Sequence, residues 1–255
     1  MSAPAPIALV GAGGRMGAAV ERALVSAPDL ELVYRADPSF PLDAGPPRSA
    51  PDLAGLRAGE VKGIIDFSSP DGVRVAAEGA RRLGCALVSG TTGIEEGARV
   101  LLREVSKTVP VCWSPNFSIG APLLAAALRA AARLLPPDWQ LEVTEVHHAG
   151  KRDAPSGTAI RMAEGWRQAR GGPLVHGRHG ITGPRAPDEV GMHALRLGDV
   201  VGEHRLLLGG AGEVLEGIHR VQDRSAFARG CIEALRRLMR QGPGWYEWDE
   251  LLIGS

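Results

Sequence analysis

Short apolar runs and amphipathic stretches alternate along the first half of the chain. Five apolar runs have the length and the valine and isoleucine content of buried strands, at residues 7–10, 30–34, 63–67, 86–90 and 109–113. Between several of them, apolar residues recur at helical spacing, near residues 16–24, 71–83 and 95–107. This alternation predicts an α/β fold with a doubly wound parallel sheet and helices on both of its faces. The Pro-rich residues 37–51 are expected to form a loop.

The second half of the chain has a different pattern. After a helix predicted at residues 121–134 come four longer strand-like runs, at residues 140–148, 189–197, 200–210 and 213–221. One strong helix, at residues 157–170, interrupts them, and an amphipathic helix at about residues 225–240 follows them. Strands in succession predict a second, α+β domain with a mainly antiparallel sheet, and the domain boundary is expected near Ser118.

Composition narrows the class of protein. The chain of 255 residues carries 29 basic and 29 acidic residues, so it lacks the basic excess of nucleic-acid and membrane-surface proteins. The N-terminus does not resemble a signal peptide, and Arg129 and Arg133 interrupt the most apolar stretch, which therefore predicts a helix of a water-soluble protein. Cys85, Cys112 and Cys231 form no CxxC pair, so we expect no disulfide framework, no metal site and a cytoplasmic location.

A glycine-rich loop, "VGAGGRMG", joins the first predicted strand to the first predicted helix. Glycines at this place allow a pyrophosphate to approach the backbone and the N–H groups of a helix start, as in Rossmann-like dinucleotide-binding folds. The spacing is one residue longer than the common motif, with Gly11, Gly14 and Gly17 in the glycine positions. The alternative interpretation is an ordinary glycine-rich turn between a strand and a helix.

An acidic residue should follow the last glycine by about 20 residues and bind the ribose hydroxyls. Asp37 stands at that distance, although an aspartate before a proline is also a common turn signal. Pro38 occupies the place where a protein that binds the 2′-phosphate of NADPH would favour arginine. This mildly favours NADH over NADPH, but Arg35 and Arg48 remain as alternative phosphate ligands.

Two polar loops directly follow predicted strands, "GTTG" at residues 90–93 and "SPNFSIG" at residues 114–120. Ligands of parallel sheets bind at the carboxyl ends of the strands, so both loops are expected at the nicotinamide end of a dinucleotide. Thr91, Thr92 and Asn116 offer hydrogen bonds to a carboxamide. Alternatively, Thr92 and Ser118 only begin helices.

The stretch "HHAGKRDAPSGTA" concentrates proton donors directly before a predicted helix. His147, His148 and Lys151 precede a helix start whose first N–H groups belong to Gly157 and Thr158, and such a start binds carboxylates. A site of this kind suits a substrate with carboxylates and a step that needs a proton. The other interpretation is a set of surface side chains before an ordinary helix cap. Only three of the 29 basic residues are lysines, and lysine, unlike arginine, can release its proton.

These motifs together resemble one enzyme family. "GAGGRMG", "DFSSPDG", "GTTG", "SPNFSIG", "EVTEVHHAGKRDAPSGTA", "VGEH" and "EGIH" are similar, in this order, to segments of the 4-hydroxy-tetrahydrodipicolinate reductases, also called dihydrodipicolinate reductases. Pro38 departs from members that carry an arginine for the NADPH phosphate, and Gly217 replaces a common β-branched residue. The resemblance implies reduction of a cyclic unsaturated imine dicarboxylate by NAD(P)H, in lysine and diaminopimelate biosynthesis.

The resemblance also implies roles for domains and residues. Residues 1–118, with a C-terminal part at 228–255 that packs back on them, would bind the dinucleotide, and residues 119–227 would bind substrate and form a homotetramer. His147 and Lys151 would transfer the proton, and His148, Gly157 and Thr158 would bind substrate. Cofactor binding would fall to Gly11, Ala12, Gly13, Gly14, Arg15, Met16, Asp37, Gly90, Thr91, Thr92, Ser114, Pro115, Asn116 and Phe117.

Two other functions fit part of the sequence. One is another two-domain NAD(P)-dependent dehydrogenase, which the histidine–lysine stretch argues against. The other is a non-catalytic protein that senses dinucleotides, which would tolerate loss of the proton donors that this chain retains.

Overall fold

The apolar runs of the first half form the strands of one parallel sheet. The computed structural model describes residues 3–254, and these strands are β1 (Ala5–Val10), β2 (Leu30–Ala36), β3 (Arg48–Ala50), β4 (Gly63–Asp66), β5 (Ala86–Ser89), β6 (Pro110–Trp113) and β12 (Gly244–Tyr246). The order across the sheet is β12-β6-β5-β4-β1-β2-β3. Each neighbouring pair is parallel. The predicted doubly wound parallel sheet is therefore confirmed.

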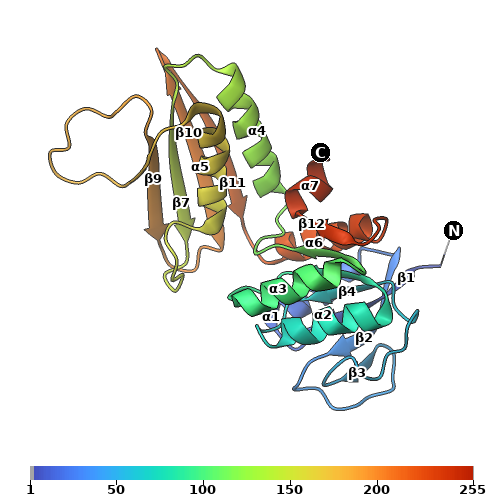
Figure 1. The fold of residues 1–255 in the computed structure, drawn as a ribbon. Coiled ribbons are helices and arrows are strands. Elements are labelled where there is room, and N and C mark those ends of the chain that lie inside the picture. The colour runs from blue at the N-terminus through green and yellow to red at the C-terminus, as the bar shows by residue number, and fades with distance from the viewer. Residues whose placement is uncertain (1–2, 255) are drawn as a thin grey trace. The chain divides into compact units, whose positions relative to one another are not determined.

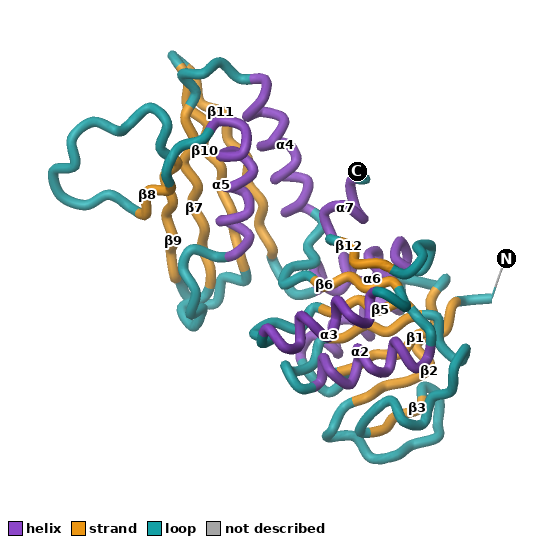
Figure 2. The backbone as a smooth tube through the Cα atoms, viewed as in Figure 1, coloured by secondary structure: helices purple, strands orange, loops and turns teal. Residues whose placement is uncertain are grey.

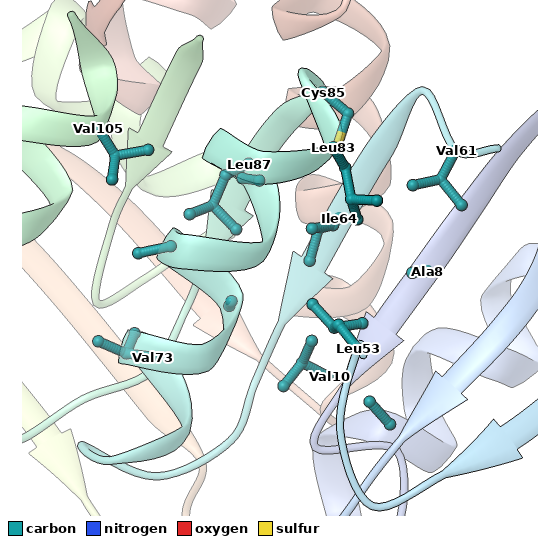
Figure 3. Close-up of a cluster of buried hydrophobic side chains, with 14 of the residues drawn as sticks. Ala8, Val10, Leu53, Val61, Ile64, Val73, Leu83, Cys85, Leu87 and Val105 are labelled. Atoms are coloured by element: carbon teal, nitrogen blue, oxygen red, sulfur yellow. The ribbon is translucent and has the colours of Figure 1, made fainter. Parts of the chain in front are cut away.

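Helices cover both faces of this sheet, as its buried strands require. They are α1 (Arg15–Leu24), α2 (Gly72–Leu83), α3 (Glu96–Ser106), α6 (Ser225–Leu238) and α7 (Trp248–Ile253). One buried cluster lies between the sheet and α2 and α3, and includes Val10, Ile64, Val73 and Leu87 (Figure 3). A second cluster lies on the opposite face and joins α1, α6 and Trp248 to the sheet.

Helix α6 packs closely against β4 and against the backbone at Phe117, because a glycine at each of these two contacts carries no side chain. A Cβ at Gly230 would lie 1.6 Å from the carbonyl oxygen of Phe117, and a Cβ at Gly63 would lie 2.6 Å from a methyl group of Leu235. Trp248 adds a hydrogen bond of 3.2 Å from its indole nitrogen to the carbonyl oxygen of Ser118. The C-terminal segment is therefore an integral part of the first sheet's packing.

The later strand-like runs form a second sheet. Its strands are β7 (Gln140–His147), β8 (Leu174–His176), β9 (Val190–Arg196), β10 (Gly202–Gly210) and β11 (Glu213–Val221). The order is β11-β10-β7-β9-β8, in which β7 pairs with β10 and β10 with β11 in antiparallel fashion. β9, however, pairs in parallel with β7 and β8. This sheet is thus mixed: the helix α5 (Gly157–Arg170) leads from β7 into β8, and the next strand, β9, lies between β7 and β8 and runs parallel to both.

Helices α4 (Gly120–Leu134) and α5 cover one face of the second sheet (Figure 2). Along β10, residues alternate between buried and half-buried. The buried set packs against the helices with Leu141 and Val143 of β7, and the other set forms a half-exposed face.

The chain divides into two compact units. The first comprises Met1–Ser118 and Arg224–Ser255, and the second comprises Ile119–Asp223. The colour gradient of Figure 1 shows red C-terminal elements among the blue and green elements of the first unit. Within residues 3–254, no helix is both long and apolar enough to cross a membrane.

Candidate active site

The strand order places a topological switch point at the carboxyl ends of β1 and β4. From β1 the chain proceeds to β2 and β3 on one side, and from β4 to β5 and β6 on the other. Such a point, where the winding direction reverses, is where doubly wound sheets bind their ligands. The loops that follow β1, β4 and β5 therefore form the candidate nucleotide site of the first unit.

The glycine loop after β1 has the geometry of a phosphate-binding turn. Gly11 has a φ of +78°, and a Cβ there would lie 2.4 Å from the carbonyl oxygen of Phe67. A Cβ at Gly17 would lie 2.4 Å from the carbonyl oxygen of Gly11. Helix α1 begins at Arg15, and Gly14 supplies no side-chain cap. The turn therefore fits a pyrophosphate, which needs close approach and helix N–H groups.

Asp37 lies beside this loop, as its spacing predicted. Its Oδ2 accepts a hydrogen bond of 3.0 Å from the Gly13 N–H, and its Oδ1 accepts bonds of 3.0 and 2.6 Å from the backbone and hydroxyl of Ser39. Partial burial opposes ionisation, but these hydrogen bonds prevail and lower the pKa of Asp37. The carboxylate is thus held charged against the turn.

The two arginines near Asp37 have other partners. Arg35 lies over the ring of Phe40, with its guanidinium carbon 5.8 Å from the ring centroid. Arg48 donates a hydrogen bond of 2.9 Å to Glu60. Both are therefore already engaged with the protein's own side chains.

A buried carboxylate organises the loops after β4 and β5. Asp66 is fully buried and accepts hydrogen bonds from Ser68, from the Ser89 hydroxyl at 2.6 Å and from the Thr91 hydroxyl at 2.8 Å. Burial raises its pKa, and these hydrogen bonds only partly offset the effect. The Thr91 hydroxyl also accepts the Ser68 N–H at 2.9 Å. It therefore points inward, whereas the neighbouring Thr92 is exposed.

The remaining candidate cofactor residues follow β5 and β6. A Cβ at Gly90 would lie 2.0 Å from the ring of Phe67, so this ring packs on the backbone there. The Ser114 hydroxyl donates a hydrogen bond of 2.8 Å to the carbonyl oxygen of Asn116, and Pro115 between them is exposed. Phe117 is buried against Phe67 and Trp248. The side chain of Phe117 is thus part of the core.

In the second unit, His147 ends β7 and contacts a buried carboxylate. Its Nδ1 lies 2.5 Å from Oε2 of Glu145, which is fully buried. Glu145 also accepts the Ser156 N–H at 3.1 Å and two hydrogen bonds from Arg196, at 3.0 and 2.9 Å. One carboxylate therefore joins β7, β9 and the residue that caps α5.

Two further histidines form a row with His147 on the helix-covered face of the sheet: His204 lies beside His147, and His219 lies beside His204. The ring centroids of His147 and His204 are 5.4 Å apart, and the ring centroids of His204 and His219 are 6.1 Å apart. The Nε2 of His204 lies 3.1 Å from the Ser156 hydroxyl. Burial lowers the pKa of His204 to about 3, so it is neutral at physiological pH.

The other predicted residues lie in the loop between β7 and α5. Lys151 is bound to both oxygens of Asp153, at 2.8 and 2.9 Å, and His148 is exposed. Ser156 caps α5 by accepting the Ala159 N–H at 3.2 Å. Gly157 is exposed, and a Cβ there would meet nothing within 4 Å. The helix start is therefore accessible to a small anion.

Sequence reasoning gave no role to Glu145, His204, Arg196 or Asp66. A signal was nevertheless present for two of them. Glu145 is in phase with the apolar residues of β7, and His204 is in phase with those of β10. A titratable residue on the apolar face of an alternating strand is costly unless it is bonded, and so marks a site worth testing.

The neutral state of His204 should make the protein sensitive to acid. Its folded-state pKa lies below the ordinary value of 6.5, so the unfolded chain takes up a proton first as pH falls. Stability is therefore complete above pH 6.5 and decreases towards pH 4, by up to about 1.4 kcal/mol per pH unit for one group. In His204→Asn, the free energy of unfolding, measured by urea denaturation from pH 7 to 4, should depend less steeply on pH. The exposed His176→Asn should retain the wild-type slope, and an equal slope in His204→Asn would contradict the assignment.

Comparison with known proteins adds independent information. A model of the dihydrodipicolinate reductase N-terminus matches residues 5–117, and one of the C-terminus matches residues 120–252. A 4-hydroxy-tetrahydrodipicolinate reductase from Thermomicrobium roseum is 43% identical over 256 residues, which are 96% of this chain and 98% of the relative. The enzyme of that name from Nitrosomonas europaea is 35% identical and covers 98% of both chains.

Solved structures share the fold at lower sequence identity. A dipicolinate-bound dihydrodipicolinate reductase from Paenisporosarcina sp. TG-14 has a TM-score of 0.77 at 23% identity, covering 96% of this chain and 97% of that one. An engineered D-amino acid dehydrogenase bound to NADP⁺ has a TM-score of 0.60 at 18% identity, covering 99% and 97%. The two family models account for nearly the whole chain, and the relatives match it over nearly full length. The chain therefore belongs to the dihydrodipicolinate reductase family.

Proposed function

We propose that the chain reduces a cyclic unsaturated imine dicarboxylate, 4-hydroxy-tetrahydrodipicolinate or its dehydrated dihydrodipicolinate form, to tetrahydrodipicolinate with NAD(P)H. This reaction belongs to lysine and diaminopimelate biosynthesis. The observation that carries the proposal is the arrangement at the end of β7, where a histidine held by a buried carboxylate lies next to an accessible helix start. Full-length similarity to reductases of that name supports it. The three cysteines are free and buried, which supports a cytoplasmic location.

The first unit supplies the dinucleotide-binding residues. The turn at Gly11, Ala12, Gly13 and Gly14, with the first N–H groups of α1 at Arg15 and Met16, would bind the pyrophosphate, and Asp37 would bind the ribose. When bound, the nicotinamide supplies the hydride. Gly90, Thr92, Ser114, Pro115 and Asn116 would surround its ring. The hydroxyl of Thr91 points inward and the ring of Phe117 is buried. These two residues would therefore contact the cofactor through their backbone groups.

The second unit supplies the substrate-binding and proton-transfer residues. The start of α5 at Gly157 and Thr158, with the exposed His148, would bind a carboxylate through N–H donors and the helix dipole. Hydride addition places negative charge on the conjugated ring, and a neighbouring carbon then needs a proton. His147 and Lys151 are the candidate donors, and a positioned acid accelerates such a step by about 10²–10⁴-fold.

The test of this function is a coupled assay. The purified protein should oxidise NADH or NADPH only when the substrate is generated in situ from pyruvate and aspartate semialdehyde by the preceding synthase. The decrease in absorbance of the reduced nicotinamide measures the reaction. A folded protein that oxidises neither cofactor in the presence of substrate would contradict the proposal.

Within the same assay we propose that NADH serves at least as well as NADPH. Asp37 carries a charge beside the turn, Pro38 offers no cation, and Arg35 and Arg48 already have partners. Pro38→Arg should move the ratio of kcat/KM values towards NADPH. A wild-type preference for NADPH of more than tenfold, about 1.4 kcal/mol, would mean that another group recognises the phosphate.

Substitutions at His147 and Lys151 should identify the proton donor. The bond of Lys151 to Asp153 suits a charged anchor, and the carboxylate behind His147 suits a donor. Loss of a donor should lower kcat by about 10²-fold or more, whereas loss of an anchor should mainly raise KM. We expect the first result for His147→Gln and the second for Lys151→Met, with Lys151→Arg close to wild type. A large loss of kcat in both Lys151 variants, with His147→Gln active, would reverse the assignment.

We also propose that the protein is a homotetramer assembled through the second unit. One face of its sheet is covered by α4 and α5, but the other is half-exposed. On β11 this face presents Val214, which is 65% exposed, and Ile218, which is 51% exposed. Unburied apolar side chains on a sheet face are typical of an interface.

Sedimentation equilibrium should therefore give a mass four times that of the chain. Ile218→Glu should produce smaller species, because it places charges on the proposed interface. Leu123→Glu, on the exposed side of α4, should remain tetrameric. A monomeric wild-type protein at micromolar concentration would refute this assembly.

A further inference from the structure

Glu145 is the one described residue whose carboxylate contacts His147, Arg196 and the cap of α5 together. It is 0% exposed. Its two oxygens make four contacts: two with Arg196, one with the Ser156 N–H and one with the His147 ring. Burial opposes its ionisation, yet the bonds from Arg196 and His147 lower its pKa. Glu145 is therefore an ionised group that only accepts hydrogen bonds.

This charge state determines the tautomer of His147. Since the carboxylate accepts, Nδ1 of His147 must carry the proton that it donates. The other ring nitrogen, Nε2, is then the atom that gains or releases a proton. It faces Gly202 of β10, where a Cβ would lie only 3.1 Å away. The glycine thus leaves Nε2 without a side chain pressed against it.

A second glutamate of β7 shows what a structural network of the same composition looks like. Glu142 lies on the opposite, half-exposed face and contacts His193 at 2.7 Å and the guanidinium groups of Arg178 and Arg185 at 2.8 and 3.0 Å. These arginines belong to the loop between β8 and β9, so this network attaches a loop to the sheet. Glu145 instead connects a candidate donor to a candidate carboxylate-binding helix start.

We propose that Glu145 is a positioning residue for the reaction: it orients Nε2 of His147 towards the substrate and sets its distance from the start of α5. This inference rests on the proposed role of His147 as proton donor. Arg196 supports it by balancing the charge of Glu145 from β9. The arrangement follows the general logic of a buried carboxylate that orients a catalytic imidazole.

The charged groups around His147 define the expected pH behaviour. Burial lowers the pKa of His147, Glu145 opposes this effect, and Lys151 and Arg196 lower the pKa further. His204, the neighbouring ring on β10, is neutral. A donor must be protonated, so activity is present below the pKa of His147 and is lost as pH rises through it. Removing the charge of Glu145 should move this loss to lower pH.

Glu145→Gln tests the proposal, because an amide cannot accept from all of these donors. In the wild-type protein, ¹⁵N NMR of labelled histidines, assigned with His147→Gln, should show neutral His147 protonated on Nδ1. In Glu145→Gln we expect a different tautomer or a pKa lower by about one unit. The basic limb of the kcat/KM profile should shift in the same direction, and kcat should fall by about 10²–10⁴-fold. Glu145→Asp should restore part of kcat.

Glu142→Gln is the matched control, because it removes a carboxylate with arginine and histidine partners from the same strand. It should leave the His147 tautomer and the basic limb unchanged. A wild-type His147 protonated on Nε2, or a Glu145→Gln variant with the wild-type tautomer and limb, overturns the proposal even if activity falls. If the His147 signals shift in Glu145→Gln while His147→Gln retains wild-type kcat, the donor role of His147 is the part that fails.

Discussion

A parallel sheet must be covered on both faces, and this constraint governs the path of the whole chain. Helices α2 and α3 cover one face of the first sheet with residues that follow β4 and β5 directly. On the other face, α1 is the only covering helix that precedes β6 in the chain, and α6 with Trp248 of α7 provides the remaining cover. The second unit is consequently an insertion between β6 and α6. Gly230 and Gly63 permit this packing because side chains there would collide with neighbouring atoms.

The two buried carboxylates of the structure illustrate how partners determine charge. Asp66 and Glu145 are both fully buried. Asp66 is surrounded by hydroxyl and amide donors, and burial raises its pKa. Glu145 has a guanidinium and an imidazole as partners, and its pKa is lowered. Hydrogen bonds from neutral groups thus do not fully replace hydration, whereas an opposite charge does.

Much of the fold was predictable from the sequence because its elements are long and periodic. Helix α5 has the predicted bounds, and the predicted strands lie within two residues of the observed ones. The short elements β3, β8, β12 and α7 were missed, because three to six residues contain too few repeats to show a period. The predicted loop at residues 37–51 was wrong where β3 lies. The parallel pairing of β9 depends on tertiary packing, which local patterns do not encode.

The candidate site was predictable to a similar degree. The glycine turn and its acidic partner were found because their spacing along the chain reflects local geometry, and Asp37 does contact Gly13. The direction of a hydroxyl, such as that of Thr91, depends on a strand 25 residues away. The contact of Arg196 with Glu145 spans 51 residues. Such contacts are visible only once the strands are paired.

The insertion has a consequence for biosynthesis of the polypeptide. Ribosomes release the N-terminus first, and domains generally begin to fold as they emerge. The apolar side chains that α6 covers, among them Ile65, Val88 and Cys112, are made well before α6 itself. During translation of the inserted second unit, this face of the nascent sheet lacks its cover. The first unit can complete its core only after Trp248, which belongs to the same buried cluster, has left the ribosome. Chaperones that hold exposed apolar surface therefore have a defined interval in which to act.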